Sequence, residues 1–168
     1  MILGGGAGLA VLILGFGLPA ELMGSAPRNP EWRAVAADVR VLDGDTLRLG
    51  DRTLRLYGLD APERGQQCVN VAGQTYDCGG AAAAALAQLV AERGVSCRLH
   101  GRDRFGRALG VCHADGVELN ASVVSAGWAL ADAGQQPALV PLEAAARARQ
   151  SGLWAGGFTP PPHWRSGR

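Results

Sequence analysis

Hydrophobic and polar positions alternate over short stretches near the start of the folded region, which predicts paired β-strands. The alternating stretch from Val35 to Leu42 indicates a first strand. Two further runs, Asp45–Leu49 and Arg52–Leu59, flank Gly50-Asp51, a dipeptide suited to a tight two-residue turn. We therefore predict a hairpin in which residue 49 pairs with residue 52 and apolar side chains share one face.

Later segments alternate between helical and strand-like patterns. The Ala-rich run Ala81–Arg93 ends before a glycine and predicts a helix. Val95–His100 and Ala108–His113 predict a second hairpin, and shorter helices are expected over Leu119–Ala126 and Pro141–Ser151. The second half of the chain is therefore expected to add two strands and two helices to the first.

Five short strands, with one helix between the third and fourth and two more at the end, predict an α+β fold that is mainly β. The pattern favours a five-stranded oligonucleotide-binding (OB) barrel with three helices, placed over residues 35–156. A sandwich would need about seven strands. An open α+β sheet would use the same hairpins in another arrangement and remains the alternative.

The two ends of the chain differ from this central region. Residues 1–26 start with eighteen uncharged residues and predict a signal peptide or a membrane anchor, with residues 1–20 as a possible membrane tether. Residues 27–34 are expected to form a proline-containing linker, and residues 157–168 a Pro-rich, irregular C-terminal tail. This organisation predicts an exported protein, which is periplasmic, secreted or membrane-anchored outside the cytoplasm.

Composition narrows the classes of function. Sixteen basic and fifteen acidic residues give a net charge of +1, so the composition does not indicate the strongly basic surface typical of many nucleic-acid-binding proteins. Every basic residue is arginine, and only 5% of residues are aromatic. Forked guanidinium donors are thus abundant, while stacking platforms for bases are scarce. Function must therefore be inferred from individual sites.

Charged residues concentrate in three short segments, VLDGDT at 41–46, RLYGLDAPE at 55–63 and DRFGR at 103–107. Each has an ordinary structural interpretation when taken alone: an Asp-Gly turn, a strand end with surface ion pairs, and a solvated turn arginine. Together they supply a carboxylate pair for a divalent cation, a further carboxylate able to activate water, and two arginines. Hydrolysis of a phosphodiester needs that combination.

These segments, with ADGVELNASVVSAGWA and EAAARARQSGLW after them, resemble the thermonuclease (staphylococcal nuclease-like) family in order and spacing. The resemblance extends from about Val35 to Trp154. It implies the five-stranded OB barrel with three helices and a calcium-dependent endonuclease. Such an enzyme cleaves DNA and RNA with little sequence specificity and leaves 3′-phosphate ends.

The resemblance also assigns roles by position in the motifs. It implies two catalytic arginines and one catalytic carboxylate, which are Arg55, Arg107 and Glu63. It implies calcium ligands, which are the carboxylates of Asp45 and Asp60 and the backbone carbonyl of Ala61. It places Asp43 and Thr46 beside the metal as supporting residues. Oxygen-only ligands of this kind suit Ca²⁺ and not zinc.

The chain departs from the family pattern in its substrate-binding residues. Tyrosines that line the nucleotide pocket in relatives are replaced here by the stretch Leu130–Gln136, and lysines that contact phosphates are absent. Arg102 and Arg104 are expected to take over part of that role. A catalytically silent barrel that binds nucleic acid or another anionic polymer is the alternative function. No feature implies a protein partner, and a monomer is expected.

Four cysteines resolve into two local pairs. In the second hairpin, the register that pairs Arg102 with Arg107 also sets Cys97 opposite Cys112, which predicts a disulfide between them. Cys68 and Cys78 remain in the long loop after Glu63, and a second disulfide is predicted there. The alternative is four reduced cysteines. Two bridges behind an apolar leader would fit an oxidising compartment.

Overall fold

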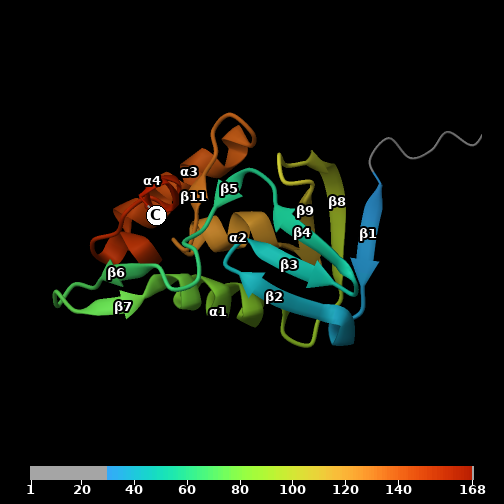
Figure 1. The fold of residues 1–168 in the computed structure, drawn as a ribbon, viewed down its shortest axis with the longest axis horizontal. Coiled ribbons are helices and arrows are strands. Elements are labelled where there is room, and N and C mark those ends of the chain that lie inside the picture. The colour runs from blue at the N-terminus through green and yellow to red at the C-terminus, as the bar shows by residue number, and fades with distance from the viewer. Residues whose placement is uncertain (1–29, 168) are drawn as a thin grey trace, which may run out of the picture.

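A seven-stranded sheet dominates the computed structural model, which describes residues 30–167. Hydrogen-bonded neighbours follow the order β1-β8-β9-β4-β3-β2, with β10 paired to β9 (Figure 1). The strands of this sheet are β1 (Glu31–Ala34), β2 (Val39–Asp43), β3 (Thr46–Leu49), β4 (Arg52–Leu56), β8 (Val95–Arg102), β9 (Ala108–Ala114) and β10 (Val117–Glu118). Among the described strands, β4 and β9 form the one parallel pair, and this pair joins the two hairpins side by side.

Two small ribbons and four α-helices complete the described fold. β5 (Leu59–Asp60) pairs with β11 (Leu130–Ala131), and β6 (Gln67–Val69) pairs with β7 (Thr75–Asp77) in a hairpin that projects from the body (Figure 1). The α-helices are α1 (Cys78–Val90), α2 (Leu119–Ser125), α3 (Val140–Ala148) and α4 (Pro161–Ser166). Single 3-10 turns lie at Ala36–Asp38, Pro137–Leu139 and Gly152–Ala155.

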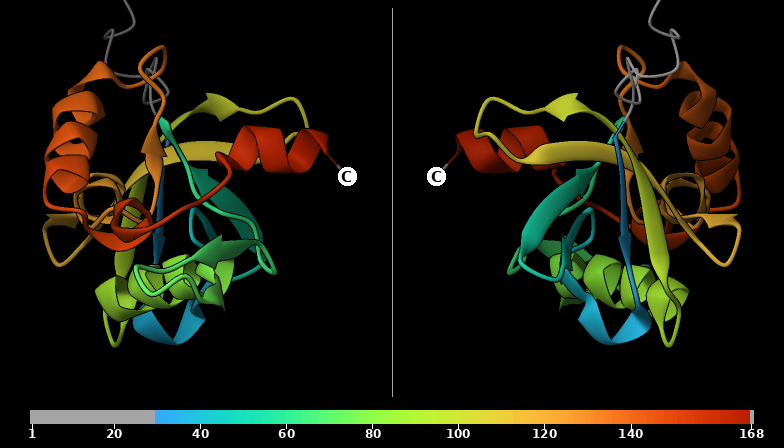
Figure 2. Two further views of the ribbon diagram at one scale, coloured as in Figure 1. Left: turned by 90° about the vertical axis from the view of Figure 1, so that its left-hand side faces the viewer. Right: turned by 90° about the vertical axis from the view of Figure 1, so that its right-hand side faces the viewer.

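The core lies between the strongly twisted sheet and helices α1 and α2, as the side views in Figure 2 show. Leu47, Leu54, Leu86 and Val123 are fully buried there. The alternation of apolar positions along β3 and β4 supplies one wall. Helix α1 begins where the side chain of Asp77 accepts a hydrogen bond from the backbone N–H of Gly80, the usual role of an N-cap aspartate.

The predicted fold class is confirmed, and so is the first hairpin. Leu49 pairs with Arg52 and Leu47 with Leu54, as the turn dipeptide predicts. A closed barrel of five strands is not confirmed, because the pairings in residues 30–167 form an open path with β1 and β2 at its ends. The described residues form four α-helices where three were expected.

The N-terminal boundary of the folded region differs from the prediction. The linker expected over residues 27–34 contributes strand β1, whose residues pair with β8 from Glu31 opposite Arg98 to Ala34 opposite Val95. The first predicted strand begins later than expected, at Val39, because a 3-10 turn occupies Ala36–Asp38. Four residues at the edge of a sheet give too short an alternation to separate a strand from a linker.

The second hairpin contains an irregularity that differs from the predicted pairing of its strands. Cys97 lies opposite Cys112 as predicted, but the register shifts between Leu99 and Gly101, and Arg102 then pairs with Ala108 instead of Arg107. Gly101 has a φ of +117°, a conformation that favours glycine. One extra residue in β8 is a β-bulge, and it changes the pairing only on the side of the turn.

The Pro-rich tail is not wholly irregular, because residues 161–166 form helix α4. Prolines at its first positions have the φ angle that a first helical turn requires and lack an N–H that would stay unpaired there. The predicted leader and tether, residues 1–26, lie outside the described residues. Within residues 30–167, the structure has no helix long and apolar enough to cross a membrane.

Both predicted disulfides are present. Cys97 and Cys112 are bridged across β8 and β9, with Cα atoms 4.0 Å apart. Cys68 and Cys78 are bridged between β6 and the start of α1, with Cα atoms 5.6 Å apart. The first bridge lies within the core, and the second fastens the projecting hairpin to α1.

Candidate active site

One arginine of β4 meets two carboxylates, one from the turn before β3 and one from β5, in a cluster that is largely shielded from water. Nη2 of Arg55 lies 2.7 Å from Oδ2 of Asp45 and also donates to Oδ1 of Asp60. The three side chains are at most 18% exposed. The guanidinium therefore offsets one of the two negative charges of carboxylates that water reaches poorly, and buried charges of this kind require such a partner.

Asp45 is fixed by its neighbours on both oxygens. The Thr46 hydroxyl donates to Oδ1 at 2.8 Å, and the Ala61 backbone N–H donates to Oδ2 at 3.2 Å. Burial raises the pKa of Asp45, while Arg55 and these donors act in the opposite direction. Gly44 allows the close approach, since a Cβ there would lie 2.7 Å from that of Ala82 and 2.9 Å from that of Ala61.

Asp60 and Glu63 meet a second arginine, which comes from helix α4. Nη2 of Arg165 donates to Oδ2 of Asp60 at 2.6 Å, and Nη1 donates to Oδ1 of Asp60 at 3.1 Å and to Oε1 of Glu63 at 2.8 Å. These two carboxylates raise the pKa of Arg165, which keeps the guanidinium charged. Asp43 lies nearby, 3.5 Å from Arg64, and burial and the charge of Glu63 raise its pKa.

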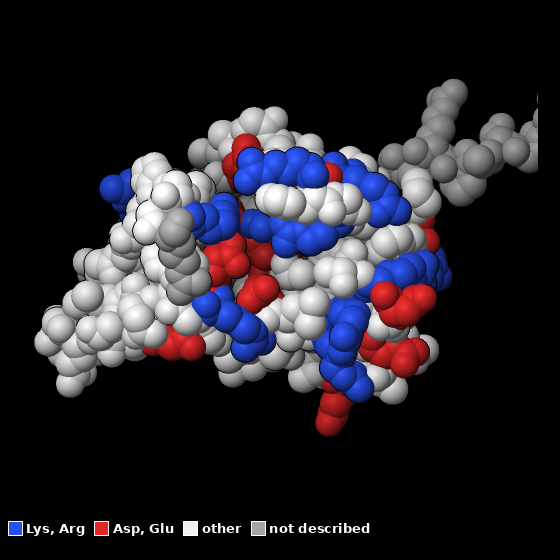
Figure 3. Space-filling model, viewed as in Figure 1, with Lys and Arg blue, Asp and Glu red and all other residues white. Residues whose placement is uncertain are grey.

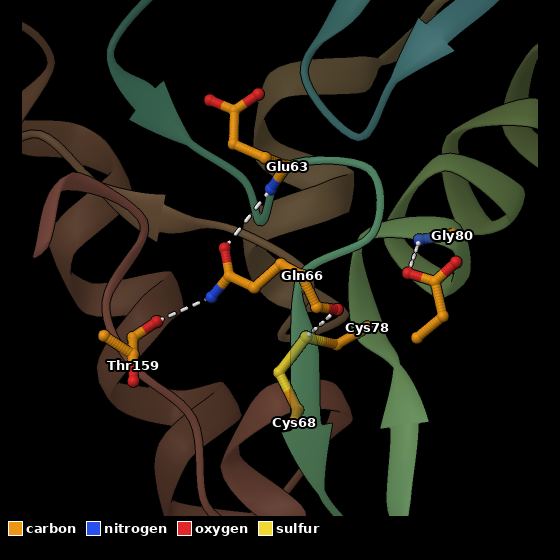
Figure 4. The surroundings of a disulfide bond; sticks show 7 residues. Glu63, Gln66, Cys68, Cys78, Gly80 and Thr159 are labelled. Carbon is orange, nitrogen blue, oxygen red and sulfur yellow. Dashed lines mark hydrogen bonds between the residues drawn. A yellow bond between two sulfur atoms is a disulfide. The ribbon is translucent and has the colours of Figure 1, made fainter. Parts of the chain in front are cut away.

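The loop that carries Glu63 is held by buried Gln66. The Gln66 side chain accepts a hydrogen bond from the Glu63 N–H at 3.3 Å and donates to the Thr159 carbonyl at 2.7 Å (Figure 4). The start of α1 presses against the same loop, because a Cβ on Gly79 would lie 1.8 Å from the Glu63 carbonyl oxygen. The position of the Glu63 backbone is thus set by three separate parts of the chain.

Arg107 lies at the end of the turn between β8 and β9, and hydrogen bonds to Asp103 fix its position. Asp103 accepts the Arg107 Nε–H at 2.7 Å and the backbone N–H groups of Arg107 and Phe105 at 2.9 Å each. Desolvation opposes ionisation of Asp103, but these hydrogen bonds outweigh it and hold the pKa of Asp103 below its usual value. The guanidinium groups of Arg104 and Arg107 lie over the ring of Phe105, which is 69% exposed.

One cleft of about 940 Å³ collects most of these groups. It lies between the β8–β9 turn and helix α4, and it is lined by residues that include Arg55, Tyr57, Asp60, Glu63, Asp103, Arg104, Phe105, Arg107 and Arg165. Figure 3 shows this face of the molecule, where acidic side chains lie in a hollow bordered by basic ones. The cleft has cationic walls around an anionic floor.

The cleft is lined by half of the ten predicted site residues. Arg55, Asp60, Glu63, Arg104 and Arg107 line it. Three of the remaining residues, which are Asp45, Thr46 and Ala61, are buried behind it. Arg102 lies outside it: its side chain donates to the Gly106 carbonyl at 2.6 Å and lines a separate hollow with Trp32 and Arg52.

The carboxylates satisfy one requirement of a hard-cation site. Asp45 Oδ2 and Asp60 Oδ1 both contact a single nitrogen of Arg55, so two anionic oxygens converge on one positively charged atom. Oxygen donors of this kind fit Ca²⁺. Within the described part of the chain, no group of three or more His, Cys, Asp or Glu side chains is placed to hold a metal. Such an ion would therefore need further oxygen ligands from backbone or water.

Two features of the cleft could not be foreseen in the sequence. Arg165 is more than 100 residues from Asp60 and lies in a segment with no periodic pattern. Tyr57 stacks on His100 with ring centroids 4.7 Å apart, which supplies an aromatic wall in a chain with few aromatic residues. Only the tail motif PPPHWR could have drawn attention to Arg165, through its Pro-initiated helical turn.

The sequence matches a known family over this region. Residues 53–156 fit the model of the staphylococcal nuclease homologues. The chain belongs to this family. The matched region includes Arg55, Asp60, Glu63 and Arg107, and helix α4 lies outside it. The predicted family, and with it the class of enzyme, a nuclease-type hydrolase, are confirmed.

The chain is also similar to individual proteins, two of which are named as nucleases. The chain is 35% identical to an uncharacterised endonuclease of Escherichia coli over 147 residues, 80% of this chain and 90% of that protein. It is 34% identical over 123 residues to a succinoglycan biosynthesis protein, ExoI, of Rhizobium meliloti (strain 1021), which covers 71% of this chain and 64% of that protein. A probable staphylococcal-like nuclease of rice is 30% identical, with 67% of this chain and 32% of that protein covered.

Proposed function

We propose that the protein is an exported, calcium-dependent endonuclease. It hydrolyses phosphodiester bonds of DNA and RNA with little sequence specificity and leaves 3′-phosphate ends. The observation that carries the proposal is the convergence of Arg55, Glu63 and Arg107 on one cleft, with the carboxylates of Asp45 and Asp60 beside them. Phosphodiester hydrolysis requires those elements: a base, positive charge around the phosphate, and ligands for a cation.

Each residue has a defined part in the proposed reaction. Glu63 accepts a proton from the attacking water, whose oxygen forms the new bond to phosphorus while the bond to the 5′ oxygen breaks. Arg55 and Arg107 bind the non-bridging phosphate oxygens, where negative charge increases in the transition state. Asp103 keeps the Arg107 guanidinium oriented through its 2.7 Å contact. The 5′ oxygen leaves with a proton taken from the surrounding water.

Calcium, when bound, would supply charge that orients the phosphate and the water. Asp45 and Asp60 would hold it, with the carbonyl of Ala61 as the proposed backbone ligand and Asp43 and Thr46 as supporting groups. Arg55 contacts both carboxylates, so the charge that binds phosphate lies beside the charge that binds the cation. The anionic floor would otherwise repel a polyanionic substrate.

Nucleic acid would enter across the β8–β9 turn. Arg104 lines the cleft, and Phe105 and Arg107 border both the cleft and the neighbouring hollow that contains Arg102. A base can stack on the exposed Phe105 ring while phosphates meet the flanking guanidinium groups. Such contacts do not read base edges, which supports the proposed lack of sequence specificity.

Export is supported by the two disulfides, because such bonds persist in oxidising compartments. The decisive experiment is digestion of single-stranded DNA and RNA by the purified protein with calcium, with and without a chelator. The termini of the products are then tested for removal of a 3′-phosphate by a phosphatase. Binding without any cleavage would contradict the proposal and support a silent binding module.

A further inference from the structure

Helix α4, which lies outside the residues that match the family model, places an arginine in the wall of the cleft. The Arg165 guanidinium bridges two carboxylates. Nη2 donates a hydrogen bond to Asp60, and Nη1 donates to both Asp60 and Glu63, at distances of 2.6 to 3.1 Å. Its side chain is 37% exposed, so it forms part of the wall of the cleft.

The guanidinium completes the fixation of Asp60. Arg55 approaches Oδ1 of Asp60 from β4, and Arg165 approaches Oδ2 from α4, so the carboxylate is gripped on both oxygens. For Glu63, Arg165 supplies the one ion pair that the structure shows within residues 30–167. Two carboxylates three residues apart repel one another, and a shared charged fork offsets that repulsion while fixing their spacing.

The segment that leads into helix α4 is hydrogen-bonded to the loop that contains Glu63. The Gln66 side chain is fully buried and joins the Glu63 backbone to the Thr159 carbonyl, two residues before α4 begins. The Gln66 carbonyl in turn accepts from the backbone N–H of Cys78 at 3.1 Å, and Figure 4 shows the disulfide between Cys78 and Cys68 beside Gln66. The entry to α4 and the Glu63 loop therefore share one anchor.

We propose that Arg165 is a positioning residue of the active site, which holds Glu63 and Asp60 in the geometry needed for hydrolysis. The inference rests on the proposed nuclease function. A positioning role can be distinguished by experiment from two other roles that an arginine in this cleft could have. A phosphate-binding arginine would act on substrate affinity, and an inhibitory plug would depress activity. A positioning residue acts on the rate of the bound complex.

The test compares Arg165→Met and Arg165→Lys with the parent protein and with Arg149→Met. Methionine keeps the length and apolar stem of the side chain, and lysine keeps the charge without the fork. Arg149 is the matched control, because it donates to the Ser125 carbonyl on the far end of α2 and does not line the cleft. For each protein, kcat and KM on single-stranded DNA are measured, together with DNA affinity without calcium and the melting temperature.

We expect Arg165→Met to lower kcat at least tenfold, with KM and DNA affinity within about threefold of the parent. Arg165→Lys should recover part of kcat, and Arg149→Met should match the parent. Higher activity of Arg165→Met would identify a plug, and weaker DNA binding with normal kcat would identify a phosphate ligand; either result overturns the inference. So would unchanged kinetics in an active parent, whereas an inactive parent would overturn the proposed function and the inference with it.

Discussion

Nη2 of Arg55 lies 2.7 Å from Oδ2 of Asp45, and this ion pair joins the proposed phosphate-binding group to the proposed cation-binding group. Asp45 is only 4% exposed, so its charge depends on Arg55 and on the two hydrogen bonds from Thr46 and Ala61. The phosphate and cation functions of the site are therefore coupled through one guanidinium.

Replacement of Arg55 by Lys tests that coupling. Lysine keeps the positive charge but cannot meet Asp45, Asp60 and a phosphate oxygen with one planar fork, so kcat should fall about 100-fold or more. Steady-state hydrolysis of single-stranded DNA measures the effect. Arg40→Lys is the control, because the Arg40 side chain donates only to backbone carbonyls away from the cleft. Parent-level activity of Arg55→Lys would disprove the assigned role.

Glu63→Gln removes the proposed base with little change in shape. The amide oxygen can still accept the hydrogen bond from Arg165, so the fold and the melting temperature should be retained. Turnover should drop by about 100-fold or more, since general-base catalysis contributes about 10²–10⁴ to the rate. The measurement is single-turnover cleavage at saturating enzyme. If the variant cleaves as fast as the parent, another group activates the water.

Calcium removal should abolish cleavage reversibly, and zinc should not restore it. The convergent donors are carboxylate oxygens, which suit calcium. None of the three histidines is among the residues that line the cleft: His100 stacks on Tyr57, His113 lies 4.0 Å from Glu118, and His163 is in α4. Chelated protein is assayed after adding calcium or zinc, and its calcium affinity is measured by calorimetry. Restoration by zinc alone would contradict the proposed ligands.

The two disulfides should differ in what their removal affects. Each bridge is expected to contribute up to about 3 kcal/mol to the free energy of unfolding. The Cys97→Ala, Cys112→Ala double variant should lose stability only, because that bridge joins two strands of the core. The Cys68→Ala, Cys78→Ala double variant should also lose kcat, because Cys78 supports Gln66, which holds Glu63.

Melting temperatures and kcat at a temperature where both double variants are folded separate the two effects. Intact-mass measurement after alkylation, with and without prior reduction, first establishes that the parent has no free thiol. Equal losses of kcat in both variants would show that the bridge near Glu63 has no special influence on the active site.

Binding of single-stranded DNA should weaken steeply with salt and should depend on Phe105. Phosphate contacts by arginine release counterions, and a base stacked on an aromatic ring contributes about 1–3 kcal/mol. Phe105→Ala should therefore weaken binding by about fivefold or more, measured by fluorescence anisotropy at several salt concentrations. Val71→Ala is a matched control, since Val71 is 82% exposed on the projecting hairpin. Salt-insensitive affinity would contradict this picture.

Local signals in the sequence were sufficient for the fold class, the first hairpin and both disulfides. The turn dipeptide Gly50-Asp51 fixes a register, and opposed positions in a hairpin bring Cys97 to Cys112. The grouping of Arg55, Glu63 and Arg107 came from motifs and the family resemblance. The hairpin and the Cys97–Cys112 pair are encoded around single turns, whereas the grouping of the site residues depends on motifs far apart in the chain.

The β-bulge, strand β1 and the position of Arg165 depend on contacts between distant segments, which no local sequence pattern indicates. The bulge at Gly101 changes the partner of Arg102, and β1 is defined by pairing with β8 and not by its own four residues. Arg165 enters the site because α4 is fastened to the Glu63 loop through Gln66 and Thr159, which are 93 residues apart. Such placements follow from tertiary packing and are absent from propensity and periodicity.

The parallel pairing of β4 with β9 has a consequence for how the site forms. Arg55 pairs with Leu109, 54 residues away in the chain, whereas each hairpin closes through a short turn of its own. Contacts between distant segments cost more loop-closure entropy and slow folding. The face that presents Arg55 and Arg107 together exists only once the two hairpins have joined. Recovery of cleavage after refolding should therefore come no earlier than the joining of the hairpins, whereas far-ultraviolet signals from the individual strands can recover before it.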